Sequence, residues 1–245
     1  MSQTAAYDTI AEAYQDSKRL PFREYIERYT LFDTLGDIHG KAVLDLACGE
    51  GFYTRLLKQA GAATVTGVDI SAAMIQLAEK EERRHPLGCR YLHQDVLKLK
   101  TAQPVDVVVA MYLLNYARTR EELRRFCLVG HATLRPGGRF VGINDNVHDP
   151  PRGHVSLAKY GLEKTCADPP TEGDTIRYTI TNADGQQFEF NNFFLKPETY
   201  EDAFQAAEFR KFEWVAVSLH PSQRNNPFWD DFLRNPPLIA FTALK

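Results

Sequence analysis

The stretch 43–69, VLDLACGEGFYTRLLKQAGAATVTGVD, constrains the fold of this chain more than any other part of the sequence. An apolar run short enough for a buried strand leads into a turn that contains Gly49 and Gly51. Apolar residues at helical spacing follow over 52–60, and a second apolar run ends in Asp69. Strand, glycine turn, helix and strand with a terminal acid together predict one nucleoside-binding βαβ unit.

The glycines and the acid of this unit have the chemistry that a nucleoside ligand requires. Gly49 and Gly51 have no Cβ atoms, so their backbone can approach a ligand closely and adopt positive φ angles. The N–H groups that open the next helix point toward such a ligand. Asp69 follows Gly49 by 20 positions, about the spacing at which a carboxylate accepts hydrogen bonds from ribose hydroxyls. Two glycines alone would equally fit an ordinary βα turn, and it is the acid that favours the nucleoside site.

The loop D-L-A-C-G-E-G at 45–51 resembles motif I of the class I S-adenosylmethionine-dependent methyltransferases. An NAD-linked oxidoreductase is the less favoured alternative, because a dinucleotide fingerprint would place glycine or alanine where Thr54 stands. The resemblance implies an α/β fold with a Rossmann-like, seven-stranded, mostly parallel sheet, an antiparallel last strand and helices on both faces. It also implies that the cofactor is S-adenosyl-L-methionine and the product S-adenosyl-L-homocysteine.

The length of 245 residues suits one α/β domain, but the amino-acid composition changes along the chain. Residues 144–195 are rich in Pro, Gly, Asp and His and contain a D-G hairpin signal, which predicts a small β insertion after the fifth strand. We therefore expect a single methyltransferase domain, 1–245. Its expected parts are a helical lid (1–39), a cofactor-binding core (40–143), a substrate-cover insertion (144–195) and a C-terminal helix with strands (196–245).

The composition, with 44% apolar and 25% charged residues, is that of a globular protein, and no apolar run is long enough to span a bilayer. The start of the chain lacks the basic and apolar regions of a secretory signal. The four cysteines are widely spaced without a C-x-x-C pair, which favours free thiols, a reducing compartment and no metal site. A net charge of −3 argues against a nucleic-acid substrate. We expect a cytoplasmic monomer or homodimer with a small-molecule substrate and no membrane partner.

The family resemblance implies which residues bind the cofactor. The pattern Y-D-x-x-A-x-x-Y at 7–14 is similar to a lid helix whose tyrosines close over the methionine end. Ile70 matches the position that packs on adenine, and Asp95 matches the acceptor for the adenine amino group. Ile70 and Met74 would equally suit the core, and Asp95 would equally suit a helix N-cap. The expected cofactor-binding set is Tyr7, Tyr14, Asp45, Ala47, Gly49, Gly51, Asp69, Ile70, Met74, Asp95, Val96, Met111 and Tyr116.

The methyl acceptor is expected to meet polar and aromatic residues near the ends of the later strands. The expected substrate-pocket residues are Tyr112, Asn115, Asn144 and Trp229, and the expected catalytic residues are Tyr7, His148 and Asn115. A general base is needed only if the nucleophile arrives protonated. The candidate bases are Tyr7, His148 and Asp145, with His154 and His220 as weaker ones. We favour catalysis mainly by proximity, with no dedicated base.

In four short segments the chain looks most like a small-molecule N-methyltransferase subgroup, the toxoflavin-biosynthesis N-methyltransferases. The similarity rests on A-x-Y-D-x-I at 5–10, the V-L-D-L-A-C-G loop, A-K-Y-G at 158–161 and F-E-W at 212–214. It implies methylation of a ring nitrogen of a heterocyclic natural product. The chain departs from that subgroup in the insertion and the C-terminal loop, where the substrate is selected. Methylation of oxygen or carbon, or cofactor binding without catalysis, are therefore the alternatives.

Overall fold

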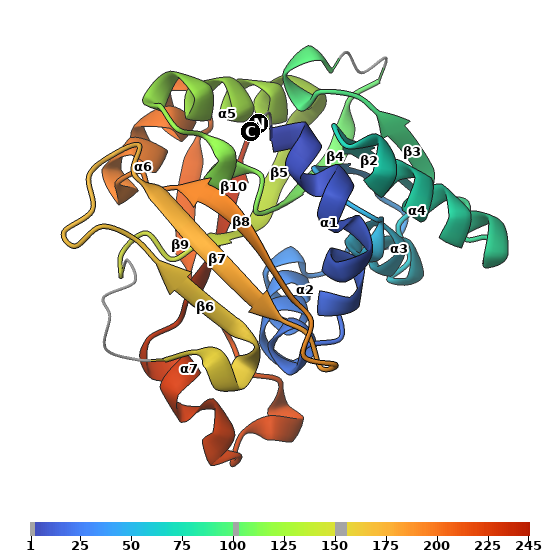
Figure 1. Cartoon of the computed structure of the whole chain (residues 1–245). Coiled ribbons are helices and arrows are strands. Elements are labelled where there is room, and N and C mark those ends of the chain that lie inside the picture. Colours follow the sequence, from blue (N-terminus) through green and yellow to red (C-terminus); the bar gives the residue numbers. More distant parts are fainter. Residues whose placement is uncertain (1–2, 100–102, 150–155) are drawn as a thin grey trace.

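A seven-stranded sheet forms the centre of the molecule (Figure 1). The computed structural model describes residues 3–99, 103–149 and 156–245, with side chains from residue 10 onward. The strands follow the order β3-β2-β1-β4-β5-β10-β9, and β10 runs antiparallel to both of its neighbours. Their bounds are β1 Ala42–Leu46, β2 Thr64–Asp69, β3 Arg90–His93, β4 Val105–Met111, β5 Leu134–Asp145, β9 Lys211–Val215 and β10 Leu238–Leu244. The predicted α/β fold is thus confirmed.

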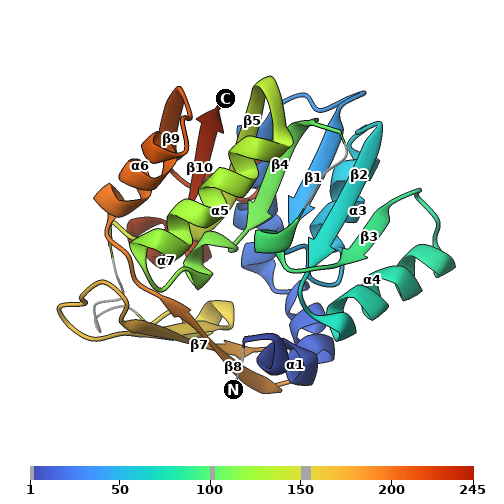
Figure 2. The same cartoon turned by 90° about the horizontal axis from the view of Figure 1, so that it is seen from above.

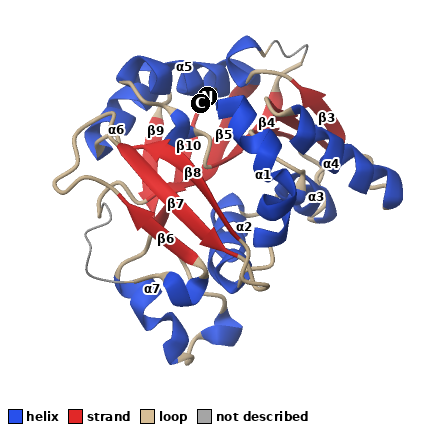
Figure 3. Cartoon of the chain, viewed as in Figure 1, coloured by secondary structure: helices blue, strands red, loops and turns tan. Residues whose placement is uncertain are grey.

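Helices cover both faces of this sheet (Figures 2 and 3). On one face α5 and α6 pack over β4, β5 and β9, and on the other α2 and α3 pack over β1, β2, β5 and β10. The helices are α1 Gln3–Ser17, a π-helical turn Arg23–Arg28, α2 Tyr29–Leu35, α3 Phe52–Gln59, α4 Ala72–Arg84, α5 Arg120–Thr133, α6 Pro197–Ala206 and α7 Asp230–Arg234. Because both faces are covered, the central strands are continuous apolar runs, as in β4.

A second, three-stranded antiparallel sheet is built by the insertion after β5. Its strands are β6 Leu162–Thr165, β7 Thr175–Thr181 and β8 Gln187–Phe193. Helix α1 packs against β8 and α4, so helix and small sheet together cover the carboxyl ends of the central strands (Figure 2). The predicted small β insertion is therefore present, with the D-G turn between β7 and β8.

The element boundaries differ from prediction where turns and short strands meet. The sequence pattern favours separate short strands at 186–190 and 193–195, but the structure has one strand there, β8, which ends at Phe193, and it adds β6. The sequence pattern also favours a strand from Phe212 to Leu219, but β9 ends at Val215, because the chain then leaves the edge of the sheet. The proline-rich loop that follows contains α7.

The L-R-P-G-G sequence at 134–138 predicts a helix stop and a turn before the fifth strand, but in the structure the segment belongs to β5 itself. Val105 pairs with Leu134 and Val107 with Arg139, so the residues between Leu134 and Arg139 bulge opposite a single residue of β4. Gly137 has a φ of +76°, which allows this bend. The segment thus bends the chain as predicted, but within a strand.

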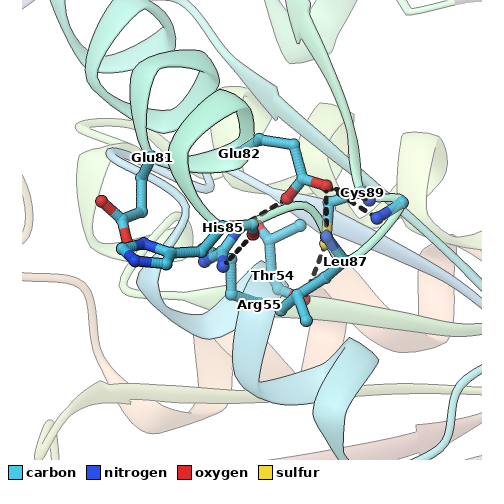
Figure 4. Close-up of polar contacts among 8 residues, drawn as sticks. Thr54, Arg55, Glu81, Glu82, His85, Leu87 and Cys89 are labelled. Carbon is cyan, nitrogen blue, oxygen red and sulfur yellow. Dashed lines mark hydrogen bonds and ion pairs between the residues drawn. The ribbon is translucent and has the colours of Figure 1, made fainter.

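A polar network around Glu82 closes the loop between α4 and β3 (Figure 4). Oε1 of Glu82 accepts hydrogen bonds from the main-chain N–H groups of Leu87, Gly88 and Cys89 at 2.7, 2.7 and 3.3 Å. Oε2 forms an ion pair with Arg55, which projects from α3. This one carboxylate therefore ties two helices to the start of an edge strand.

Among the described residues, no helix is long and apolar enough to cross a membrane. Within the same ranges, no group of three or more His, Cys, Asp or Glu side chains is placed to hold a metal ion. Three of the cysteines, Cys48, Cys89 and Cys127, are buried free thiols, and Cys166 is a half-buried one.

Candidate functional site

The glycine loop after β1 is joined to the acid that ends β2. The N–H of Gly49 donates to Oδ2 of Asp69 at 2.8 Å, and the N–H of Ser71 donates to Oδ1 at 2.8 Å. Burial raises the pKa of Asp69, and these backbone hydrogen bonds oppose the rise. Gly49 has a φ of +56°, and Ala47, two residues earlier, has a φ of +57°. These two positive φ angles turn the loop sharply after β1.

A cleft of about 290 Å³ opens at this edge of the sheet. It lies at the carboxyl ends of parallel strands, where open α/β sheets bind their ligands. The structure brings eleven of the predicted residues together as its walls. They are Tyr14, Ala47, Gly49, Asp69, Ile70, Met74, Asp95, Val96, Met111, Tyr112 and Tyr116.

Five further residues line the cleft and were not expected from the sequence. They are Leu97, Leu113, Glu122, Arg125 and Phe126. The last three lie on one face of α5, at helical spacing, and α5 begins at the same edge of the sheet at which β4 ends. A helical wheel of α5 combined with that topological rule would have found them.

Asp45 and Gly51, expected to touch the cofactor, instead shape the loop from beneath. Asp45 is fully buried and accepts a hydrogen bond from the hydroxyl of Thr54 at 2.7 Å. Burial raises the pKa of Asp45 to about 7. A Cβ on Gly51 would lie 2.6 Å from the Tyr91 hydroxyl, and the residue has a φ of +82°. Neither residue lines the cleft, because the strand and the turn direct both toward the protein interior.

Asn115 and Asn144 lie behind the cleft wall. The side-chain oxygen of Asn115 accepts a hydrogen bond from the N–H of Asp145 at 3.1 Å, which fixes the end of β5. Asn144 is fully buried within β5, near the Tyr200 hydroxyl. Their polar groups were expected to face a ligand, but Asn115, in the 3₁₀ turn Leu114–Tyr116, and Asn144, in β5, both direct them into the core.

Trp229 and His148 are also placed away from the cleft. Trp229 is buried in an aromatic cluster, where its ring stacks on Tyr160 at 5.6 Å and 12°. His148 is exposed and meets Trp214 edge-on, with ring centroids 5.4 Å apart. The C-terminal loop thus packs Trp229 against Tyr160 and Tyr25, and Trp229 does not form the pocket wall expected of it. His220, a weaker base candidate, contacts Tyr25 and Tyr29 outside the cleft.

The side chain of Tyr7 and the whole of His154 lie outside the residues that the structure describes. The backbone at Tyr7 belongs to α1, the helix that also carries Tyr14. Tyr14 lines the cleft, so the part of α1 that carries this residue borders the site.

A buried ion pair in the N-terminal region holds one wall of the cleft. Arg23 donates to Oε2 of Glu27 at 2.7 Å, and both side chains are almost completely buried. The same carboxylate accepts hydrogen bonds from the hydroxyls of Tyr53 and Tyr112. Tyr112 has a φ of +67°, rare for a large side chain, and this hydrogen bond anchors its ring. Neither Arg23 nor Glu27 was expected; the only sequence signal is their spacing of four residues on a helix.

A second, narrower cavity adjoins the cleft beneath the three-stranded sheet. Tyr14, Tyr112 and Tyr116 line both cavities, so the two meet at these three rings. The far wall of the second cavity consists of the inner faces of β6, β7 and β8 and the start of β10. The arrangement is a ligand cleft at the sheet edge joined to a covered chamber.

Comparison with known proteins agrees with this geometry. Residues 43–138 match the family described as methyltransferase domain. A ubiquinone biosynthesis O-methyltransferase from Coxiella burnetii is 35% identical over 112 residues, 44% of this chain and 46% of that protein. The chain thus spans about half the length of the curated relatives it matches.

Solved structures resemble nearly the whole chain. The CcbJ methyltransferase from Streptomyces caelestis has a TM-score of 0.69 at 18% identity, covering 99% of this chain and 98% of that one. An S-adenosylmethionine-dependent methyltransferase from Mesorhizobium loti has a TM-score of 0.63 at 20% identity, covering 88% and 95%. At such identities the likeness establishes the fold.

The chain therefore has the fold of the class I S-adenosylmethionine-dependent methyltransferases. Within it, residues 43–138 are the part that matches the methyltransferase-domain family. The glycine loop and the acid Asp69, which carried the resemblance in the sequence, both lie inside this matched segment.

Proposed function

We propose that this chain transfers a methyl group from S-adenosylmethionine to a small molecule. The observation that carries the proposal is the pair of joined cavities, one at the sheet edge and one beneath the insertion. A methyl donor and an acceptor must meet end to end for an in-line displacement, and the two cavities meet at Tyr14, Tyr112 and Tyr116.

The side chains of the cleft fit the cofactor. Asp69 and Asp95 provide acceptors for the hydroxyl and amino donors of an adenosyl group. Ile70 is 45% exposed although it is a large apolar residue, and it lines the cleft where a base would cover it. Gly49 has no side chain to fill the space above the loop. We propose that these residues bind the adenosyl group, whose sulfonium carries the transferable methyl.

If the adenosyl group binds in the cleft, each part of the chain takes a separate role. Residues 40–143 would bind the cofactor, and 1–39 and 144–195 would cover the site as lid and substrate cover. Residues 196–245 would complete the sheet. The covering elements belong to a part of the chain that the family match at 43–138 does not include, which is consistent with a role in acceptor choice.

Positioning is the proposed source of catalysis. Among the described residues no histidine lines either cavity. Replacement of the exposed His148 by alanine is therefore expected to leave turnover within a few-fold of wild type. A loss of several orders of magnitude, with cofactor affinity intact, would show that a dedicated base exists and that proximity alone is insufficient.

For the acceptor atom, we propose a ring nitrogen of a heterocyclic natural product, on the resemblance of four short segments, at 5–10, 43–49, 158–161 and 212–214, to the toxoflavin-type N-methyltransferases. Transfer to oxygen is the second candidate, because the Coxiella burnetii relative is named an O-methyltransferase. Tandem mass spectrometry of the methylated product distinguishes these two outcomes. We place the reaction in the cytoplasm on the basis of the widely spaced thiols.

The test has two stages. Calorimetric titration with S-adenosylhomocysteine measures whether the cleft binds the adenosyl group. Incubation with isotopically labelled S-adenosylmethionine and a small-molecule extract then shows which compound gains a methyl group. Binding without any methylated product would favour a non-catalytic cofactor-binding protein, and failure to bind would remove the proposal altogether.

A further inference from the structure

The inner face of the three-stranded sheet is apolar except at a few positions. Leu162, Ile180 and Phe188 on this face are buried. Two side chains with nitrogen-containing polar groups break the pattern, Lys164 of β6 and Asn192 of β8. Both line the second cavity and both are more than nine-tenths buried. Polar groups in such a position need hydrogen-bond partners.

Lys164 has two of its three N–H groups occupied. Its ammonium contacts the carboxylate of Asp145 and the carbonyl oxygen of Pro237, and lies 4.9 Å from the ring centroid of Tyr178. An ammonium has three donors and no acceptor, so one N–H is available to the cavity that Lys164 lines. A ligand there would need to present a hydrogen-bond acceptor.

Asn192, in contrast, lacks a hydrogen-bond donor for its side-chain oxygen among the described residues. This oxygen is buried. Because Ile176 pairs with Asn192, and Lys164 with Tyr178, the two polar residues stand on the outer strands with β7 between them. Their backbones are thus about 10 Å apart across the strands and about 7 Å apart along them, or about 12 Å in all. A ligand between them would need to present a donor at the Asn192 end.

The charges around the cavity are already balanced. Arg23 is paired with Glu27, and Lys164 with Asp145. Burial lowers the pKa of Lys164, but the Lys164–Asp145 pair has zero net charge whichever partner holds the proton. A charged ligand would therefore enter a desolvated cavity without a free counter-charge, which is unfavourable.

From these contacts we propose that the cavity binds an uncharged, planar ring compound with two polar groups: an acceptor for Lys164 and an N–H or O–H donor for Asn192. The inference rests on the proposed function, since the compound would be the methyl acceptor. Tyr14 and Phe190, which meet edge-on at 6.3 Å, are the aromatic walls. The cavity has room for about one water molecule, at 20 Å³, so a ring enters by displacing these walls.

Three probes that share one ring frame test this inference with the full chain saturated by S-adenosylhomocysteine. They are naphthalene, 2,7-dihydroxynaphthalene and naphthalene-2-sulfonate, and their affinities are measured by calorimetry. We expect the neutral dihydroxy compound to bind about tenfold more tightly than either of the others. Equal affinities, preference for the sulfonate, or no binding of the dihydroxy probe would each overturn the inference.

Variants of Lys164 and Asn192 test whether these two residues cause the preference for the dihydroxy probe. Asn192→Leu and Lys164→Met are each expected to reduce the dihydroxy preference by about tenfold, with affinity for S-adenosylhomocysteine unchanged. Because Lys164→Met leaves a buried carboxylate unpaired, the double variant Lys164→Met/Asp145→Asn, which removes both charges, is measured beside it. A preference that survives in Asn192→Leu and in the double variant refutes the assignment. Wild-type failure to bind S-adenosylhomocysteine would instead refute the proposed function.

Discussion

The N–H of Gly49 donates a 2.8 Å hydrogen bond to the carboxylate of Asp69, across 20 residues of sequence. The acid thus has two roles in the structure. It closes the glycine loop through this bond, and it lines the cleft at the end of β2. A carboxylate has about four lone-pair sites, so it can accept from Gly49 and Ser71 and still accept from ribose hydroxyls.

Replacement of Asp69 by alanine is expected to weaken S-adenosylhomocysteine binding by about tenfold or more, the effect of losing a charge-assisted hydrogen bond. Calorimetry measures the affinity. Asp37→Ala is the matched control, because Asp37 also accepts one backbone hydrogen bond, from His39, but is exposed and outside the cleft. Unchanged affinity in Asp69→Ala would remove the ribose assignment.

Glu27→Gln is expected to destabilise the protein by about 3 kcal/mol or more, because it leaves the buried Arg23 without its counter-charge. Glu24→Gln tests the same chemistry one turn away, in an exposed pair with Arg28, and is expected to cost less than about 0.5 kcal/mol. Urea unfolding of both variants gives the two free energies. Similar small losses would mean that the buried pair does not hold the N-terminal region in place.

The sequence predicted the fold and most of the cleft because both depend on local patterns. The strands at 42–46, 64–69 and 105–111 are mainly apolar; Gly49 follows the first of them and Asp69 ends the second. In an open α/β sheet the residues just after parallel strands gather at one edge. Order along the chain was therefore sufficient to place them at the cleft.

The residues that were misplaced depend on information that no local pattern contains. Asn115 and Trp229 have polar or amphipathic groups near a strand end or in a loop, which fits either a ligand wall or a core contact. Which of these occurs is decided by distant partners, Asp145 for Asn115 and Tyr160 for Trp229. Glu27 was missed for the same reason, since a charged residue on a helix is usually solvated.

Glu82→Ala is expected to lower the free energy of unfolding by about 1–3 kcal/mol, because three main-chain donors and Arg55 lose one shared acceptor group. Its neighbour Glu81 forms only an exposed pair with His85, so Glu81→Ala is the matched control, with an expected change below about 0.5 kcal/mol. Figure 4 shows the two acids side by side on α4. Equal effects in urea unfolding would contradict this account of the loop.

Asp45→Asn is expected to change how stability depends on pH. In the folded protein the pKa of Asp45 is about 7, whereas an ordinary aspartate has a value of 3.8. Between these values the folded state holds a proton that the unfolded chain has released. The free energy of unfolding therefore falls as pH rises through this window, by at most about 1.4 kcal/mol per pH unit, and the loss is complete above pH 7.

Asparagine is uncharged throughout this range and keeps an oxygen that accepts from Thr54. The variant should thus lack the pH-dependent contribution of Asp45 to the free energy of unfolding. Its stability relative to wild type should increase steadily from pH 4.5 to pH 7. Burial raises the pKa of Asp69 and Glu50 in the same direction; both groups are present in both proteins, so the difference reports Asp45 together with its charge interactions with these two acids. Urea unfolding at several pH values measures the difference. Parallel curves for wild type and variant would show that Asp45 titrates as an ordinary aspartate.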